Sequence, residues 1–164
     1  MYDFSDKPLN WYDINDYFHR HSGVESNLIY ESAGMSERQF TATIAIPTYR
    51  RSRLLVRAID SAIHQAGINN YEIIVVDNDD LKDEATDKLM QSYCKKYKNI
   101  RYYRNDSNIG ITGNWNRCIE LARGKWVVLL HDDDVMLKSY LKTTLYWANK
   151  SNCTLLGVFH TDLY

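Results

Sequence analysis

The sequence predicts an α/β fold: a mostly parallel, Rossmann-like sheet flanked by helices. Three short, largely apolar runs, at 43–46, 72–76 and 126–130, have the length and composition of strands buried on both faces. Segments with apolar residues at helical spacing lie between them. Strand and helix recur at intervals of roughly 30 residues, which indicates right-handed βαβ units in one sheet.

The first half of this pattern starts with the strand at 43–46, which Pro47 ends. Ser52 is the expected cap of the next helix, whose apolar positions run over 55–66 before Gly67. The run at 72–76 is the second buried strand. A helix with apolar positions between 89 and 97 follows the acidic loop.

The second half starts with residues 100–103, which alternate like a more exposed strand. A helix over 115–122 follows, with Thr112 as its expected cap and Gly124 as its stop. The strand at 126–130 is expected to be fully buried. The remaining elements are a helix over 140–148 and a last strand at 154–159.

Composition narrows the class of protein. The chain has 164 residues, the size of one domain with a substantial core. It carries 20 Lys+Arg and 21 Asp+Glu, and this balance argues against a nucleic-acid binder. No apolar run is long enough to cross a bilayer, and the N-terminus lacks the pattern of a secretory signal. Three widely spaced cysteines, Cys94, Cys118 and Cys153, indicate reduced thiols and a cytoplasmic protein.

Residues 1–40 are more polar and aromatic than the rest of the chain. We expect them to form an N-terminal extension that docks on the body of the protein. Ile14, Tyr17, Phe18 and His21 fit one side of a short helix. The alternative is that this segment contacts a partner or a membrane surface.

Polar segments follow three of the predicted strands directly: 47–50, 77–80 and 131–134. Because parallel strands end at one edge of a sheet, these segments are expected to meet where such folds bind ligands. Two acidic clusters there would repel each other unless a cation neutralised them, and carboxylates suit Mg²⁺ or Mn²⁺. Turn chemistry explains the acids of 77–80 equally well, but it explains those of 132–134 poorly. His131 is either a hydrogen-bonded structural residue, the favoured interpretation, or a ligand.

Two further segments of the sequence have residues that suit the binding of an anion. The glycine-bearing segment 108–113 leads into a helix N-terminus, where free backbone N–H groups favour phosphate. It matches neither the dinucleotide nor the P-loop fingerprint, so an ordinary loop remains the favoured interpretation. Arg50, Arg51 and Arg53 form a small basic run that is either a solvated face or a means of neutralising pyrophosphate.

Four of these segments, taken together and in order, resemble motifs of the family 2 glycosyltransferases, which have the GT-A fold. They are the strand end at 44–49, the "IIVVDN" segment at 73–78, the loop and helix start at 108–116, and the "LLHDDD" segment at 129–134. The resemblance extends over about residues 41–160. It implies that the extension at 1–40 is followed by an incomplete nucleotide-sugar-binding domain over 41–164.

The resemblance implies an activity and its partners. Family members transfer a sugar from a nucleotide-diphosphate-sugar donor, usually with inversion and with Mn²⁺ or Mg²⁺. A UDP-sugar is the default donor, and the acceptor is expected to be a saccharide or a lipid-linked glycan. The usual context is polysaccharide or glycolipid assembly in bacteria. A cytoplasmic protein at the inner face of the membrane fits that context, and no nucleic-acid partner is expected.

The resemblance also implies roles for individual residues. The expected donor-nucleotide contacts are Pro47, Thr48, Tyr49, Asp77, Asn78, Gly110, Asn116 and Asp132. Asp77 with Asn78 would hold the base, and Asp132 would meet the ribose. Asp133 would bind the metal, which acts as a Lewis acid on the leaving diphosphate. Asp134 is the second candidate ligand. His131 stands where the family motif begins with Asp, so the motif can also be aligned with this sequence one residue later.

Two departures from the family pattern affect these expectations. Trp115 replaces the usual Arg of the 108–116 segment, so any contact of that Arg is lost. Family members usually continue well past position 164, so the domain is expected to be truncated at its C-terminal side and to lack the catalytic carboxylate base. His160 and Asp162 follow the last predicted strand, but neither is assigned as the base. A homo-oligomer or a separate C-terminal half is the corresponding partner expectation.

Two alternatives to an enzyme follow from the same residues. The first is a truncated, non-catalytic module that binds a nucleotide sugar. The second is a phospho-acceptor receiver domain, which also places acids at strand ends. A receiver domain needs its acidic pair after the first strand, where Pro47, Thr48 and Tyr49 stand here, so it is disfavoured.

Overall fold

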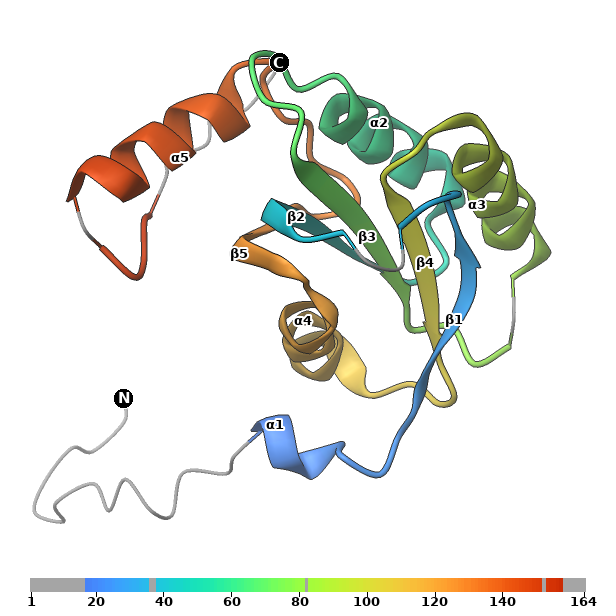
Figure 1. Cartoon of the computed structure of the whole chain (residues 1–164). Helices are drawn as coiled ribbons and strands as arrows, with labels where there is room; N and C mark the ends of the chain where they lie inside the picture. Colours follow the sequence, from blue (N-terminus) through green and yellow to red (C-terminus); the bar gives the residue numbers. More distant parts are fainter. Residues whose placement is uncertain (1–16, 36–37, 82, 152, 158–164) are drawn as a thin grey trace, which may run out of the picture.

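The structure is a computed structural model that describes residues 17–35, 38–81, 83–151 and 153–157. Its centre is a five-stranded sheet with the strand order β1-β4-β3-β2-β5. Strand β1 is antiparallel to β4, and the other neighbouring strands are parallel to each other. The α/β class and the mostly parallel sheet are therefore confirmed (Figure 1).

From β2 onward, strands and helices alternate along the chain as the sequence predicts. The strands are β1 Ser26–Glu31, β2 Phe40–Thr48, β3 Tyr71–Asp77, β4 Ile100–Asn105 and β5 Gly124–Leu129. The helices are α1 Tyr17–Arg20, α2 Ser52–Ile63, α3 Glu84–Lys96, α4 Gly110–Leu121 and α5 Tyr140–Ser151.

Helices cover both faces of the sheet. Helices α2 and α3 lie on one face, where Leu55, Ile59 and Met90 pack against the apolar side chains of β2 and β3. Helix α4 lies on the other face, where Cys118 packs against Ala45 and its neighbours (Figure 1). Because both faces are covered, every residue of β3 is buried, which explains its continuous apolar run.

Helix α5 adds to the first of these layers. Its Leu141 and Leu145 join the core beside α2. The buried side chain of Gln65, just after α2, joins that helix to the start of α5. Its Nε2 donates to the Leu137 carbonyl at 3.0 Å, and its Oε1 accepts from the Leu141 N–H at 2.8 Å. The loop between β5 and α5 is thereby held against the end of α2.

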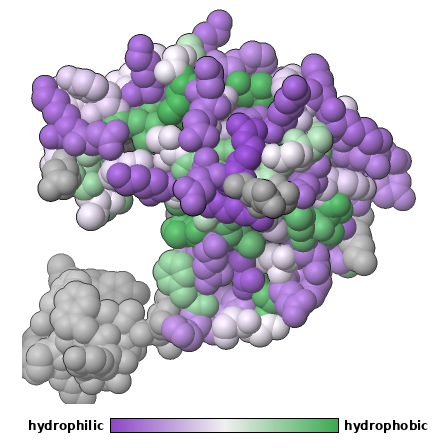
Figure 2. Space-filling model, in the orientation of Figure 1, coloured by the Kyte–Doolittle hydropathy of each residue, from purple (hydrophilic) through white to green (hydrophobic). Residues whose placement is uncertain are grey.

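The surface is largely polar. Hydrophilic residues dominate the face seen in Figure 2, and hydrophobic residues surface in smaller patches between them. Apolar side chains that are more than half exposed include Leu81, Ile111 and Leu137. None of the helices in the described segments combines the length and the apolar character that a membrane crossing requires.

Two predictions about individual strands are wrong. Residues 100–103 were expected to be more exposed, but every residue of β4 is buried, because β1 covers its outer edge and Arg101 is paired inside the protein with Glu72. Strand β1 itself, which lies within the predicted N-terminal extension, was not foreseen. The strand at 126–130 was expected to be fully buried, but β5 is only partly buried.

The exposure of β5 has a visible cause. The strand pairs with β2 on one edge, and no strand pairs with its other edge among the described residues. The last predicted strand, at 154–159, is not seen over 154–157, and its final residues lie outside the described part of the chain. Ile14 of the predicted N-terminal helix also lies outside it; α1 covers Tyr17 and Phe18, and His21 follows it.

Helix starts differ from the predicted caps. Ser52 is the first residue of α2, and the cap position is Arg51, whose side chain makes no capping hydrogen bond. Thr112 lies inside α4, which begins at Gly110. Gly124 was predicted to stop that helix. It instead opens β5 at a point where a Cβ would lie 2.4 Å from the backbone of Ala42 and Thr43, so only glycine fits.

Candidate functional site

A cavity of about 490 Å³ opens at the carboxyl edge of the sheet. It lies where β2, β3 and β5 end and where α4 begins. Its lining residues come from these four places: Pro47, Thr48, Tyr49, Arg51, Asn78, Asn108, Gly110, Ile111, Asn114, Trp115, His131, Asp132 and Asp133. Open parallel sheets bind ligands at this edge, because loops from neighbouring strands converge there.

The end of β2 is joined to the turn after β5. The buried Thr48 hydroxyl donates to Oδ2 of Asp132 at 2.8 Å, and the other carboxylate oxygen of Asp132 lies 3.3 Å from Nη1 of Arg51. The same Arg51 nitrogen lies 2.9 Å from Oδ2 of Asp133. Arg51 therefore bridges two neighbouring carboxylates at the cavity wall and offsets their repulsion.

The side chain of Asn78 organises the glycine-bearing loop. Its Oδ1 accepts from the Ile109 N–H and from Nδ2 of Asn105, both at 3.0 Å. Its Nδ2 donates to Oδ1 of Asn108 at 2.8 Å and to the Gly110 carbonyl at 3.3 Å. Gly110 has a φ of 74°, a conformation that glycine adopts without strain. The loop is thus held in the shape that starts α4.

Asp77 ends β3 beside Thr48 of β2, and it is not among the residues that line the cavity. It is fully buried, and it accepts hydrogen bonds from the Tyr102 hydroxyl at 2.8 Å and from the Asp79 N–H at 3.0 Å. Burial raises the pKa of Asp77 from 3.8 to about 6, because the interior disfavours the charged carboxylate. Asp77 therefore supports the residues that line the cavity without lining it itself.

The turn after β2 is strained. Arg50 has a φ of 55°, which is unusual for a residue other than glycine. Its Nε donates to Oδ1 of the buried Asp79 at 2.9 Å, and its guanidinium lies 4.9 Å from the centre of the Tyr49 ring. The hydrogen bond to Asp79 raises the pKa of Arg50. Strained backbone held by such contacts is typical of functional sites.

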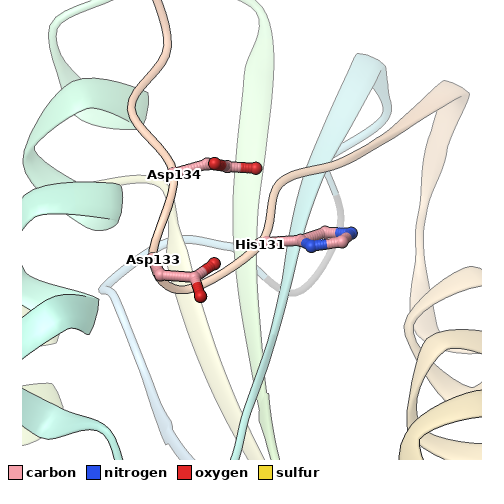
Figure 3. A group of neighbouring side chains, drawn as sticks. All are labelled: His131, Asp133 and Asp134. Atoms are coloured by element: carbon pink, nitrogen blue, oxygen red, sulfur yellow. The ribbon is translucent and has the colours of Figure 1, made fainter. Parts of the chain in front are cut away.

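A group of possible metal ligands lies on the turn after β5. One ligand atom from each of His131, Asp133 and Asp134 lies within 4.8 Å of the others, and all three residues are exposed (Figure 3). Two carboxylates and an imidazole form a donor set that suits a divalent cation. The ring nitrogens of His131 have no hydrogen-bond partner among the described residues, so the structural role favoured from sequence is not supported.

The structure brings most of the predicted donor residues together. Seven of them line the cavity: Pro47, Thr48, Tyr49, Asn78, Gly110, Asp132 and the predicted metal ligand Asp133. Three do not: Asp77 is fully buried beside Thr48, Asn116 of α4 is not among the lining residues, and Asp134 lies with Asp133 in the ligand group. His160 and Asp162 lie outside the described residues.

Some lining residues escaped the sequence analysis. Asn114, rather than Asn116, enters the cavity because α4 begins at Gly110, and residues four apart share a helix face. Its buried amide also joins the strands, since Nδ2 donates to the Val76 carbonyl and Oδ1 accepts from Asn105. The spacing of four residues between Gly110 and Asn114 is the feature of the sequence that could have identified Asn114.

Comparison with known proteins places this architecture in a family. The profile of glycosyl transferase family 2 matches residues 43–161. A Campylobacter jejuni protein named GalNAc(5)-diNAcBac-PP-undecaprenol beta-1,3-glucosyltransferase is 33% identical over 116 residues, which make up 70% of this chain and 37% of that protein. The chain thus spans little more than a third of that relative's length.

Solved structures share the fold. S. aureus TarS 1-349 in complex with UDP-GlcNAc matches with a TM-score of 0.61 and 20% identity over 74% of this chain and 37% of that one. The mannosyltransferase PcManGT from Pyrobaculum calidifontis, in complex with GDP-Man and Mn²⁺, matches with a TM-score of 0.60 and 18% identity over 73% and 35%. The sequence match, the strand order and the cavity agree, and the chain belongs to glycosyl transferase family 2.

Proposed function

We propose that this chain binds a nucleotide-diphosphate sugar and forms the donor half of a glycosyltransferase. One observation carries the proposal: a single cavity has acids and an arginine on one wall and the N-terminus of a helix on the other. A diphosphate needs both a cation and N–H donors, and a nucleoside needs an adjoining pocket. Family membership and relatives that bind UDP-GlcNAc and GDP-Man support this assignment.

The donor would lie across the cavity. Thr48 and Tyr49 line the space proposed for the nucleoside, and the buried Asp77 ends the neighbouring strand beside Thr48. The first turn of α4 has no acidic residue that would repel an anion. The Gly110 N–H already donates to Oδ1 of Asn108, so the N–H groups proposed to meet phosphate oxygens are those of Ile111 and Thr112. Asp132 is fixed by Thr48 and is proposed to meet the ribose.

A divalent metal ion, Mn²⁺ or Mg²⁺, would be held by Asp133 together with Asp134. When bound, such an ion supplies Lewis-acid stabilisation of the diphosphate leaving group. Arg51 lies 2.9 Å from Asp133, so it is placed to turn from this carboxylate toward a phosphate oxygen. The chain's own residues therefore bind and orient the diphosphate.

The acceptor is proposed by analogy with relatives. The C. jejuni relative is named for an undecaprenol-linked glycan. We propose that this protein transfers its sugar, with inversion, to a saccharide or a lipid-linked glycan at the cytoplasmic face of a membrane. The residue that acts as catalytic base is not assigned within the described part of the chain.

Calorimetric titration tests the donor site. UDP and GDP are titrated into the chain with and without Mn²⁺, and the Asp133→Ala variant is compared. The proposal expects metal-dependent binding of at least one nucleotide, weakened at least roughly tenfold in the variant. Glu84→Ala is the matched control, because it removes an exposed carboxylate of α3 that pairs with Lys88 in the next turn and is not among the cavity-lining residues. Equal binding by wild type and Asp133→Ala would overturn the proposed site.

A further inference from the structure

We propose that His131 is a third metal ligand of this site, and that its imidazole makes the site prefer a first-row transition ion over Mg²⁺. The inference deepens the proposed function and rests on it, because it names the class of metal ion that the donor site takes. It starts from the turn after β5, where four consecutive polar side chains divide into two groups.

The turn separates its acids. It is closed by a hydrogen bond of 3.1 Å from the Asp134 N–H to the His131 carbonyl. Asp132 is buried, and each of its two oxygens already has a partner, in Thr48 and Arg51. Arg51 lies closer to Asp133 than to Asp132, so it is the burial of Asp132 and its bond to Thr48 that keep this carboxylate apart from the ligand group. The side chains of His131, Asp133 and Asp134 extend from the turn toward one side, as Figure 3 shows.

Trp115 holds the imidazole in place. The centres of the Trp115 and His131 rings lie 4.9 Å apart, with an angle of 44° between their planes. Both residues line the cavity. An aromatic neighbour restricts the ring without using either nitrogen, and neither nitrogen has a hydrogen-bond partner among the described residues. Trp115 is thus a positioning residue for His131, at the place where the family usually has an arginine.

The nitrogen donor has a chemical consequence. Mg²⁺ is a small, hard ion that takes oxygen ligands and keeps several waters. Imidazole nitrogen suits the borderline first-row ions, whose affinity for such sites rises from Mn²⁺ through Fe²⁺ and Co²⁺. A site of two carboxylates alone would bind Mg²⁺ and Mn²⁺ by similar means. The added nitrogen therefore favours the transition ion.

Pulsed electron paramagnetic resonance of the Mn²⁺-loaded 164-residue chain, in the presence of UDP, tests the ligand directly. We expect a nitrogen hyperfine coupling in wild type that is lost in His131→Asn. His64→Asn is the matched control, because His64 is an exposed histidine of the α2 C-cap, hydrogen-bonded to the Asp60 carbonyl, and its loss should leave the coupling unchanged. Bound Mn²⁺ without nitrogen coupling in wild type, or a coupling that survives in His131→Asn, would overturn the inference, as would a failure to bind Mn²⁺.

Competition between Mn²⁺ and Mg²⁺ tests the selectivity. We expect His131→Asn to weaken Mn²⁺ binding by roughly tenfold or more while Mg²⁺ binding changes little. Trp115→Ala should weaken Mn²⁺ binding and broaden the nitrogen coupling, and Trp115→Phe should restore both. If nucleotide binding is supported equally by Mg²⁺ and Mn²⁺, this inference fails while the proposed function stands. If no metal ion supports nucleotide binding, the proposed function fails.

Discussion

The hydroxyl of Thr48 donates a hydrogen bond of 2.8 Å to Oδ2 of Asp132, and this contact joins the ends of β2 and β5. It fixes which carboxylate of the turn at 131–134 points into the protein. The remaining acids, Asp133 and Asp134, are left to face outward beside His131. One buried hydrogen bond therefore sets the orientation of the proposed metal and nucleotide site.

Replacing Thr48 by Val should disturb this arrangement. The substitution leaves Oδ2 of a buried carboxylate without its partner, and such a loss typically destabilises a protein by about 1–3 kcal/mol. Thr48→Ser keeps the hydroxyl and should retain most of the stability. Urea unfolding of both variants measures the difference, and UDP titration should show weaker binding in Thr48→Val. Equal unfolding free energies for the two variants would contradict this role.

The stability of the protein should depend on the protonation of Asp77. Its pKa is raised by burial from 3.8 to about 6, so the folded state binds a proton more tightly than the unfolded state does. The stabilisation from protonated Asp77 is therefore full below 3.8 and is lost as the pH rises through about 6. The difference between these pKa values corresponds to about 3 kcal/mol.

Asp77→Asn isolates this effect. We expect the unfolding free energy of wild type, relative to that of the variant, to fall between about pH 4 and pH 7. The Asn side chain keeps an oxygen that can accept from the Asp79 N–H, so the turn should be preserved. Denaturant unfolding across this pH range measures the difference. Parallel profiles for the two proteins would show that Asp77 has no raised pKa.

Breaking the buried ion pair between β3 and β4 should lower the unfolding free energy far more than breaking an exposed pair. Nη2 of Arg101 lies 2.5 Å from Oε2 of Glu72, and both side chains are almost completely buried. Arg101→Met leaves Glu72 as an unpaired buried charge, which should destabilise the protein by about 3–5 kcal/mol. Lys88→Met breaks an exposed pair with Glu84 and should cost about 0.5 kcal/mol or less. Similar losses in thermal unfolding for both variants would refute the distinction.

Gly124 should tolerate no side chain. A Cβ there would lie 2.4 Å from the Ala42 carbonyl carbon and the Thr43 nitrogen, so β2 and β5 would have to separate. Gly124→Ala should therefore destabilise the protein by at least about 2 kcal/mol. Gly23→Ala, where nothing lies within 4 Å of the added Cβ, is the control. An unfolding midpoint unchanged by Gly124→Ala would disprove the close approach.

The sequence predicted the parallel strands well because each carries its own signal. Residues 73–76 are continuously apolar, and β3 is buried throughout. Strand β1 was missed because its only strand partner is remote: Ser26 pairs with Asn105, far along the chain. The burial of β4 was misjudged for a similar reason, since Arg101 is neutralised by Glu72, which its own segment does not reveal.

The candidate site could be predicted only in part. Motif residues at strand ends, such as Thr48 and Asp133, were placed correctly at the cavity because strand direction alone determines their position. Arg51 and Trp115 reach the cavity through side-chain packing, which depends on where α2 and α4 begin. The contact of Trp115 with His131 joins two segments, so neither motif alone contains it.

Amide NMR spectra of the chain during addition of UDP and then Mn²⁺ test the central claim most directly. UDP should shift signals from residues 47–51 and 108–115, and Mn²⁺ should then broaden signals centred on 131–134. Asp133→Ala should abolish the broadening while the protein stays folded. Broadening centred on another part of the protein, such as α3, or no response to either ligand, would contradict the assignment of this cavity as a nucleotide-sugar site.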